Sequence, residues 1–154
     1  MKLTEHFDLE EFTDSQTADR VGIDNTPPPE AIEAMRALCT HVLEPLRAAL
    51  GPVSISSGYR CLALNRAIRS KDSSQHVRGE AADISVKGLT LAEVFNWLQA
   101  GGGFDQLIRE FPPRGWVHVS YAYVRTTQRG MSLLAILQKD GSTAYPLQPG
   151  PVEA

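Results

Sequence analysis

The sequence predicts an α+β domain in which helices lie on one side of a mostly antiparallel sheet. Two observations support this fold class: the first third of the chain has apolar residues at helical spacing, and the later segments read as strands separated by short turns. The length of 154 residues fits one domain, and no internal repeat suggests an array. We place the domain at residues 1–142, with an irregular lead-in at 1–29, and expect residues 143–154 to form a flexible tail.

The first long helix follows a proline-rich segment. Between Glu30 and Leu50, apolar residues recur every three or four positions, which places them on one face of a helix. Pro45 lacks a backbone donor, so we expect this helix to kink or divide there. A second helix of about ten residues is expected after Arg60, and a third begins after Thr90, whose hydroxyl can cap it.

The strands are predicted from alternating or β-type apolar runs. Two of these runs are joined by Pro-Pro-Arg-Gly, a composition that suits a hairpin turn. The polar, Ser-rich segment at 69–79 has no period and is expected to be a loop. The predicted strands cover residues 53–57, 80–86, 104–111, 116–124 and 132–138.

Composition and charge exclude several classes of partner. The hydrophobic share of 42% is ordinary for a globular chain, and the formal net charge of −3 comes with no stretch of clustered basic residues, so nucleic acid is not an expected partner. No apolar run approaches the ~18 residues of a membrane-spanning helix, and the N-terminus lacks the apolar core of a signal peptide. We therefore expect no membrane partner and a protein that is cytoplasmic at synthesis and acts as a monomer. Cys39 and Cys61 are interpreted as buried thiols, although the sequence leaves a bridge between them open.

Three polar residues occupy positions that neither a core nor an ordinary surface requires. His76 lies in the Ser-rich loop, Asp83 interrupts an apolar strand, and His118 interrupts another. Side chains alternate along a strand, so Asp83 and His118 each share a face with small or polar neighbours. Two imidazoles and one carboxylate match the three protein ligands of a catalytic zinc ion, whose fourth position is left for water. Each residue alone would be read as ordinary structure.

The sequence segments around these residues strengthen the interpretation. SGYR at 57–60, the block SSQHVRGEAAD at 73–83 and WVHVS at 116–120 occur in this order. Together they resemble the zinc D-alanyl-D-alanine carboxypeptidases and dipeptidases and the L-alanyl-D-glutamate endopeptidases of phage lysins. The resemblance extends from the lead-in to about residue 123 and implies the fold shared by these enzymes and by hedgehog domains. It also implies that His76, Asp83 and His118 bind Zn²⁺.

The resemblance suggests further site residues. Arg60 in SGYR is expected to bind substrate and to act in catalysis, because a guanidinium has forked donors that suit a carboxylate or a developing oxyanion. Ser74 and Gln75 directly precede the first ligand and are expected to bind substrate. Many relatives have a glutamate three residues before the last histidine, whereas this chain has Gly115.

Glu110 is the acidic residue that we expect to replace the missing glutamate as general base. It lies at the end of a predicted strand, and the PPRG turn could fold it back beside the strand of His118. Glu80 is the competing candidate, but alternation points it away from the face of Asp83.

The sequence therefore predicts a zinc peptidase that hydrolyses peptidoglycan peptides with metal-activated water, as either a carboxypeptidase or an endolysin-type endopeptidase. An enzyme encoded by a phage would be released from the cytoplasm to reach the cell wall. The alternative is a non-catalytic, zinc-containing module that binds the cell wall or another protein.

Overall fold

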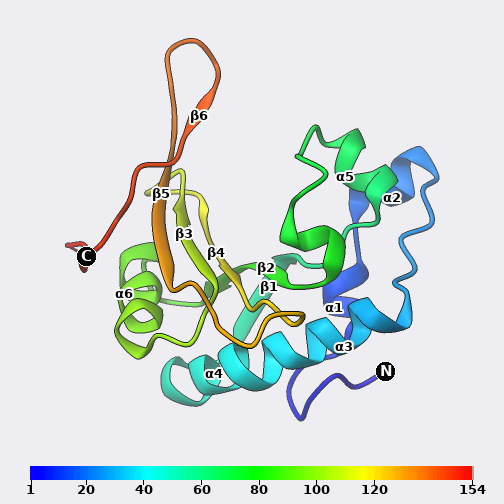
Figure 1. The fold of residues 1–154 in the computed structure, drawn as a ribbon, viewed down its shortest axis with the longest axis horizontal. Coiled ribbons are helices and arrows are strands. Elements are labelled where there is room, and N and C mark those ends of the chain that lie inside the picture. The colour runs from blue at the N-terminus through cyan, green and yellow to red at the C-terminus, as the bar shows by residue number, and fades with distance from the viewer. Residues whose placement is uncertain (154) are drawn as a thin grey trace.

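The computed structural model describes residues 1–153 and contains a six-stranded sheet with the strand order β1-β2-β4-β3-β5-β6. Neighbouring strands run antiparallel except β3 and β5, which are parallel. This confirms the predicted α+β class with a mostly antiparallel sheet (Figure 1). Within residues 1–153, no helix is both long and apolar enough to span a bilayer. The strands are β1 (Val53–Ser57), β2 (Ala81–Val86), β3 (Gln106–Glu110), β4 (Trp116–Ser120), β5 (Met131–Leu137) and β6 (Thr143–Ala144).

The helices are short except for one long rod and α6. The rod consists of α3, a π-helical turn and α4 in direct succession, and it crosses beside the sheet (Figure 1). The π turn interrupts the regular i→i−4 hydrogen bonds of the helix. It directly precedes α4, whose first turn contains Pro45, so the expected interruption is confirmed. The helices are α1 (Leu9–Thr13), α2 (Gln16–Val21), α3 (Pro29–Leu38), η1 (π, Cys39–Leu43), α4 (Glu44–Leu50), α5 (Leu62–Ala67), η2 (3₁₀, Gln75–Arg78) and α6 (Leu91–Gly101).

The two faces of the sheet have different chemistry because side chains alternate along each strand. One face packs against the helices and forms the main core, to which the strands contribute buried apolar side chains. The opposite face carries Asp83 and His118, which are direct partners across β2 and β4. Ile108 of β3 is the partner of His118 on the other side and belongs to a small second apolar cluster. The sheet thus presents polar side chains on the face away from the main core.

Two segments differ from their expected form. The helix after Arg60 ends at Ala67, because Arg69 takes a left-handed φ of 61° that a helix cannot continue through. The loop at 69–79 contains one 3₁₀ turn, η2, whose position is set by Ser74 at its start and Gly79 at its end. That turn determines where His76 points.

Residues 143–153, expected as part of a flexible tail, run back along the domain. Thr143–Ala144 pair with the end of β5, and the backbones of Pro146 and Gln148 bond to β5. Val152 exchanges two hydrogen bonds with the amide of Asn96 in α6. The segment beyond the expected domain boundary at 142 is therefore joined to both β5 and α6.

Both cysteines are free thiols. Cys39 is fully buried in the core between α3 and α4, as expected, whereas Cys61 is only half-buried. The open question of a bridge between them is thus answered in favour of two separate thiols.

Candidate metal centre

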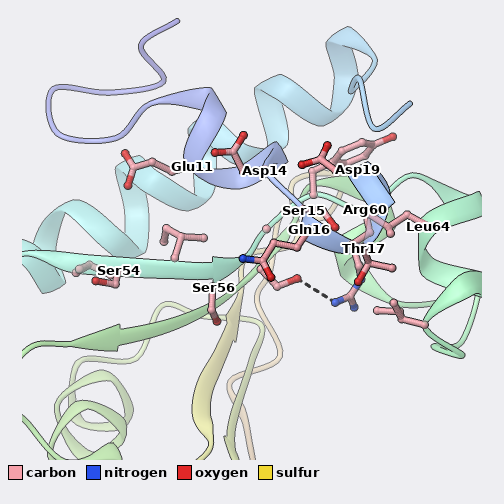
Figure 2. Close-up of a pocket in the computed structure, with 16 residues that line it drawn as sticks. Glu11, Asp14, Ser15, Gln16, Thr17, Asp19, Ser54, Ser56, Arg60 and Leu64 are labelled. Carbon is pink, nitrogen blue, oxygen red and sulfur yellow. Dashed lines mark hydrogen bonds between the residues drawn. The ribbon is translucent and has the colours of Figure 1, made fainter. Parts of the chain in front are cut away.

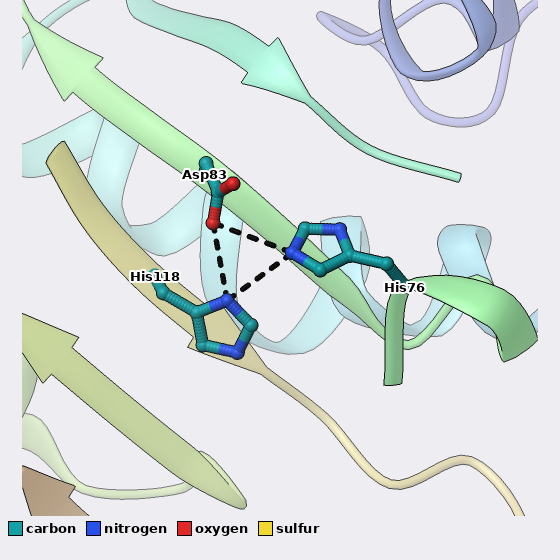
Figure 3. Close-up of side chains that lie close together, drawn as sticks. All are labelled: His76, Asp83 and His118. Atoms are coloured by element: carbon teal, nitrogen blue, oxygen red, sulfur yellow. Dashed lines mark hydrogen bonds and ion pairs between the residues drawn. The ribbon is translucent and has the colours of Figure 1, made fainter. Parts of the chain in front are cut away.

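Three side chains from two strands and the η2 turn converge on one point (Figure 3). Nε2 of His76 lies 3.2 Å from Nδ1 of His118 and 3.3 Å from Oδ1 of Asp83. The distance from Oδ1 of Asp83 to Nδ1 of His118 is 3.1 Å. Each of the three residues is less than a tenth exposed. The structure therefore brings together all three residues that the sequence predicts as metal ligands.

The ring orientation of His76 is set by the backbone of the β1–α5 segment. Its Nδ1 lies 2.6 Å from the carbonyl oxygen of Gly58, which accepts only, so Nδ1 carries the proton. In the neutral ring, Nε2 is then an unprotonated nitrogen facing the other two side chains. Gly79 ends η2 with a φ of 74°, and a Cβ there would collide with the carbonyl of Ala31 in α3. Only glycine lets η2 pack this closely against α3.

The electrostatics of the group favour a cation. Burial opposes the charged form of Asp83, but His76 and His118 together hold the pKa of its carboxyl far below the usual range. Burial lowers the pKa of His76, although Asp83 acts against this effect, so the ring is neutral near pH 7. One N–H on His118 cannot satisfy both the His76 nitrogen and the Asp83 oxygen that face it. The lone pairs that meet at this point therefore outnumber the protons that could bond to them, which favours a cation between the three donor atoms.

The distances among the three donors also suit a metal ion. Donor atoms at two corners of a tetrahedron around zinc, each ~2.0–2.1 Å from the ion, lie about 3.3 Å apart. The observed separations of 3.1 to 3.3 Å match this spacing. His76, Asp83 and His118 thus form a group that could hold a metal ion, with a nitrogen and oxygen donor set common for zinc.

Glu110 reaches the same site by way of the β3–β4 hairpin. Residues 111–115 close this hairpin, with Glu110 opposite Trp116, and Oε1 of Glu110 lies 4.0 Å from Nδ1 of His118. Burial raises the pKa of Glu110 to about 7, with the charge of Asp83 acting in the same direction. The hairpin depends on Gly115, because a Cβ at this position would overlap the carbonyl oxygen of Glu110. The structure thus brings the expected acidic residue close to the three candidate ligands.

Arg60 lies beside the three ligands and is held by neutral side chains. Its guanidinium donates to Oδ1 of Asn65 at 3.0 Å and to Oγ of Ser57 at 3.1 Å, and it approaches Oγ of Ser74 at 3.5 Å. Burial lowers the pKa of Arg60, and the charges of Asp83 and Glu110 oppose this effect. No carboxylate in residues 1–153 forms an ion pair with this guanidinium, so it can donate to a substrate oxygen.

Comparison with known proteins shows the family of this chain. The model of the family described as Peptidase M15 matches residues 5–120, which include all three converging side chains, Arg60 and Glu110. The chain belongs to the Peptidase M15 family. Members of this family are metallopeptidases, so the protein is a peptidase and the converging group is its candidate metal centre. A search among curated proteins gave no match.

Ser74 and Gln75 have different surroundings in this Peptidase M15 member. Oγ of Ser74 accepts the backbone N–H of His76 and lies near Arg60, at the edge of the metal centre. The amide nitrogen of Gln75 instead donates to Oε2 of Glu80 at 3.2 Å and to Oδ2 of Asp105 at 3.0 Å. The amide nitrogen of Gln75 is therefore bonded within the protein, and its expected substrate-binding role stays a prediction.

Glu80 and Asp105 belong to a separate buried network of the peptidase. Glu80 is 1% exposed and accepts from Arg78 and from the backbone N–H of Tyr123. Asp105 is fully buried and accepts from the guanidinium groups of Arg125 and Arg129 at 2.8 and 2.7 Å. This network, which no sequence pattern indicates, connects η2 to the segment after β4. Glu80, the competing base candidate, is held within it.

Proposed function

We propose that this peptidase uses Zn²⁺ to hydrolyse peptide bonds in peptidoglycan peptides. The observation that carries the proposal is the convergence of His76, Asp83 and His118 at 3.1 to 3.3 Å with the Glu110 carboxylate beside them. The cell-wall substrate class is supported by the resemblance of the sequence blocks around these residues to those of peptidoglycan peptidases. The donor set itself would serve the hydrolysis of any amide.

The chain's own residues supply the remaining chemistry. When bound to the three ligands, zinc supplies Lewis acidity that polarises the scissile carbonyl and lowers the pKa of water. Glu110 takes the proton from the attacking water at its carboxylate and returns it to the leaving amine. Arg60 donates to the oxygen that gains charge or to a substrate carboxylate. Ser74 supports Arg60 from η2.

Digestion of purified peptidoglycan tests this proposal. The protein loaded with zinc should release soluble peptides whose masses identify the bond that is cut, and a chelator should abolish the release. Loss of single D-amino acids would indicate a carboxypeptidase, and release of whole stem peptides an endopeptidase. A protein that binds zinc and peptidoglycan but releases no fragment would be the non-catalytic binding module instead.

A further inference from the structure

Strand β1 forms a free edge of the sheet. It pairs only with β2, and within residues 1–153 its backbone makes no backbone hydrogen bond to any other segment. An antiparallel strand turns the N–H and C=O groups of alternate residues away from its partner, so β1 presents unpaired groups on its outer side up to the bulge between Ile55 and Ser57. Such an edge can accept another extended chain as an added strand.

A groove runs along this edge. It has a volume of about 920 Å³ and is lined by β1 together with residues of the first two helices and the turn between them (Figure 2). We call it the β1 groove. Its lining consists of residues 53–60 and the side chains of Leu64 and Ile68 on one side, and of Glu11, Asp14–Thr17 and Asp19 on the other.

The β1 groove leads directly to the metal centre. Ser57, at the end of β1, is the strand partner of Asp83. Gly58, which also lines the groove, accepts the hydrogen bond that orients His76. Arg60 lines the groove and hydrogen-bonds to Ser57 (Figure 2). A chain that lay along β1 would therefore reach the candidate metal ligands at its Ser57 end.

The far side of the groove is acidic. Glu11, Asp14 and Asp19 line it there, whereas Arg60 is the one basic residue in the lining. Asp14 and Asp19 are exposed, and their carboxylates have no hydrogen-bond or ion-pair partner among residues 1–153. The charge pattern thus complements an extended peptide with an amine-bearing side chain.

We propose that the β1 groove binds the substrate peptide as a strand added to the edge of β1. An amine-bearing side chain of the peptide faces Asp14 and Asp19, and the scissile bond lies beyond Ser57. This inference rests on the proposed peptidase function, since it assigns the groove to the substrate of the metal centre. It adds a binding mode and a preference for a basic residue in the substrate.

Amide hydrogen exchange tests the binding mode without relying on turnover. The zinc-loaded Glu110→Gln protein is mixed with a cell-wall pentapeptide that contains lysine, and exchange is followed residue by residue by NMR. The outward-facing amides of β1 before the bulge at Ser56 should exchange more slowly, on the order of tenfold or more, because the peptide backbone pairs with them. Protection confined to other segments, or no binding at millimolar peptide, would overturn the inference.

Matched charge variants test the preference for an amine. In the same background, Asp14→Asn with Asp19→Asn should weaken binding of the lysine peptide about two- to tenfold, since two exposed charge pairs are lost. The peptide acetylated on its lysine amine should bind both proteins equally. Glu30→Gln with Glu33→Gln removes the same charge from exposed positions on α3 and should change neither affinity.

The outcomes separate the two proposals. The wild-type protein could hydrolyse the peptide although β1 is not protected and binding does not depend on Asp14 and Asp19. This result would support the peptidase function and contradict the inference that the β1 groove binds the substrate. Protection of β1 and charge-dependent binding without hydrolysis by the zinc-loaded wild type would support the groove and contradict the proposed function.

Discussion

The carboxylate of Glu110 lies 4.0 Å from Nδ1 of His118, although the two residues are on different strands of the β3–β4 hairpin. This places a carboxylate beside the three donor atoms without making it part of the converging group. In the proposed mechanism, a carboxylate in that position would accept the proton of the attacking water while the three donor atoms hold the metal ion.

Replacing Glu110 by Gln should therefore separate catalysis from metal binding. The amide cannot accept the proton, so the rate of peptide hydrolysis should fall by about 10²- to 10⁴-fold. Zinc content, measured by atomic absorption after dialysis, should stay at the wild-type level because the three ligands are intact. Glu33→Gln on the exposed face of α3 is the control and should retain full activity. Unchanged turnover in the Glu110 variant would assign the base to another group.

The same substitution has a second, independent consequence in the metal-free protein. Because burial raises the pKa of Glu110 from 4.5 to about 7, the folded protein keeps a proton that the unfolded chain has lost between these values. The free energy of unfolding therefore falls as the pH rises through this window. Glutamine does not titrate, so the stability of Glu110→Gln relative to wild type should increase by about 1 to 3 kcal/mol between about pH 5 and pH 8.

Urea denaturation in the presence of a chelator measures this difference at both pH values. A difference that stays constant with pH would mean that Glu110 ionises near its ordinary pKa. Comparing each variant with wild type at the same pH removes the part of the titration of His76 and Asp83 that does not depend on the charge of Glu110. Their lowered pKa values act in the opposite direction and reduce stability as the pH falls.

Asp105 should contribute to stability without contacting the metal centre. Removing its charge leaves Arg125 and Arg129 without their carboxylate, so Asp105→Asn should lower the free energy of unfolding by about 2 to 4 kcal/mol. The segment at 122–130 should also become more sensitive to limited proteolysis. Asp72→Asn removes an arginine pair that is largely exposed and should have a much smaller effect. Equal effects of the two substitutions would contradict a special role for burial at Asp105.

The two thiols should differ in reactivity. Cys39 is fully buried, and burial raises the pKa of its thiol, so it should resist alkylation in the folded protein. Cys61 is half-buried and should react first. Iodoacetamide labelling followed by peptide mass spectrometry should find the label on Cys61 alone until denaturant is added. Labelling of Cys39 at the same rate would show that the core around α3 and α4 opens readily.

The convergence of the three candidate metal ligands could be predicted because these residues break local patterns. Asp83 and His118 interrupt apolar strands, and alternation along a strand tells which face each side chain occupies. The division of the long helix was also predictable, because Pro45 lacks the backbone donor that a regular helix requires. These features depend on neighbours in the sequence.

The features that no local sequence pattern indicates depend on contacts between distant residues. Asp105 looks like an ordinary loop carboxylate until Arg125 and Arg129 are brought to it by the fold. Gln75 is adjacent to His76, but the tight η2 turn sends its side chain toward Asp105. The segment at 143–153 has no periodicity of its own, because its partners lie in β5 and α6.

Gly115 restricts where this hairpin can carry an acidic residue. The hairpin that delivers Glu110 leaves no room for a side chain at 115, so a glutamate there would displace the one five residues earlier. The substitution Gly115→Glu would therefore disturb the hairpin that holds Glu110 and would not simply shift the acidic residue from position 110 to position 115. The acidic residue at position 110 and the glycine at position 115 are thus linked in this chain: the first can take its place only while the second has no side chain.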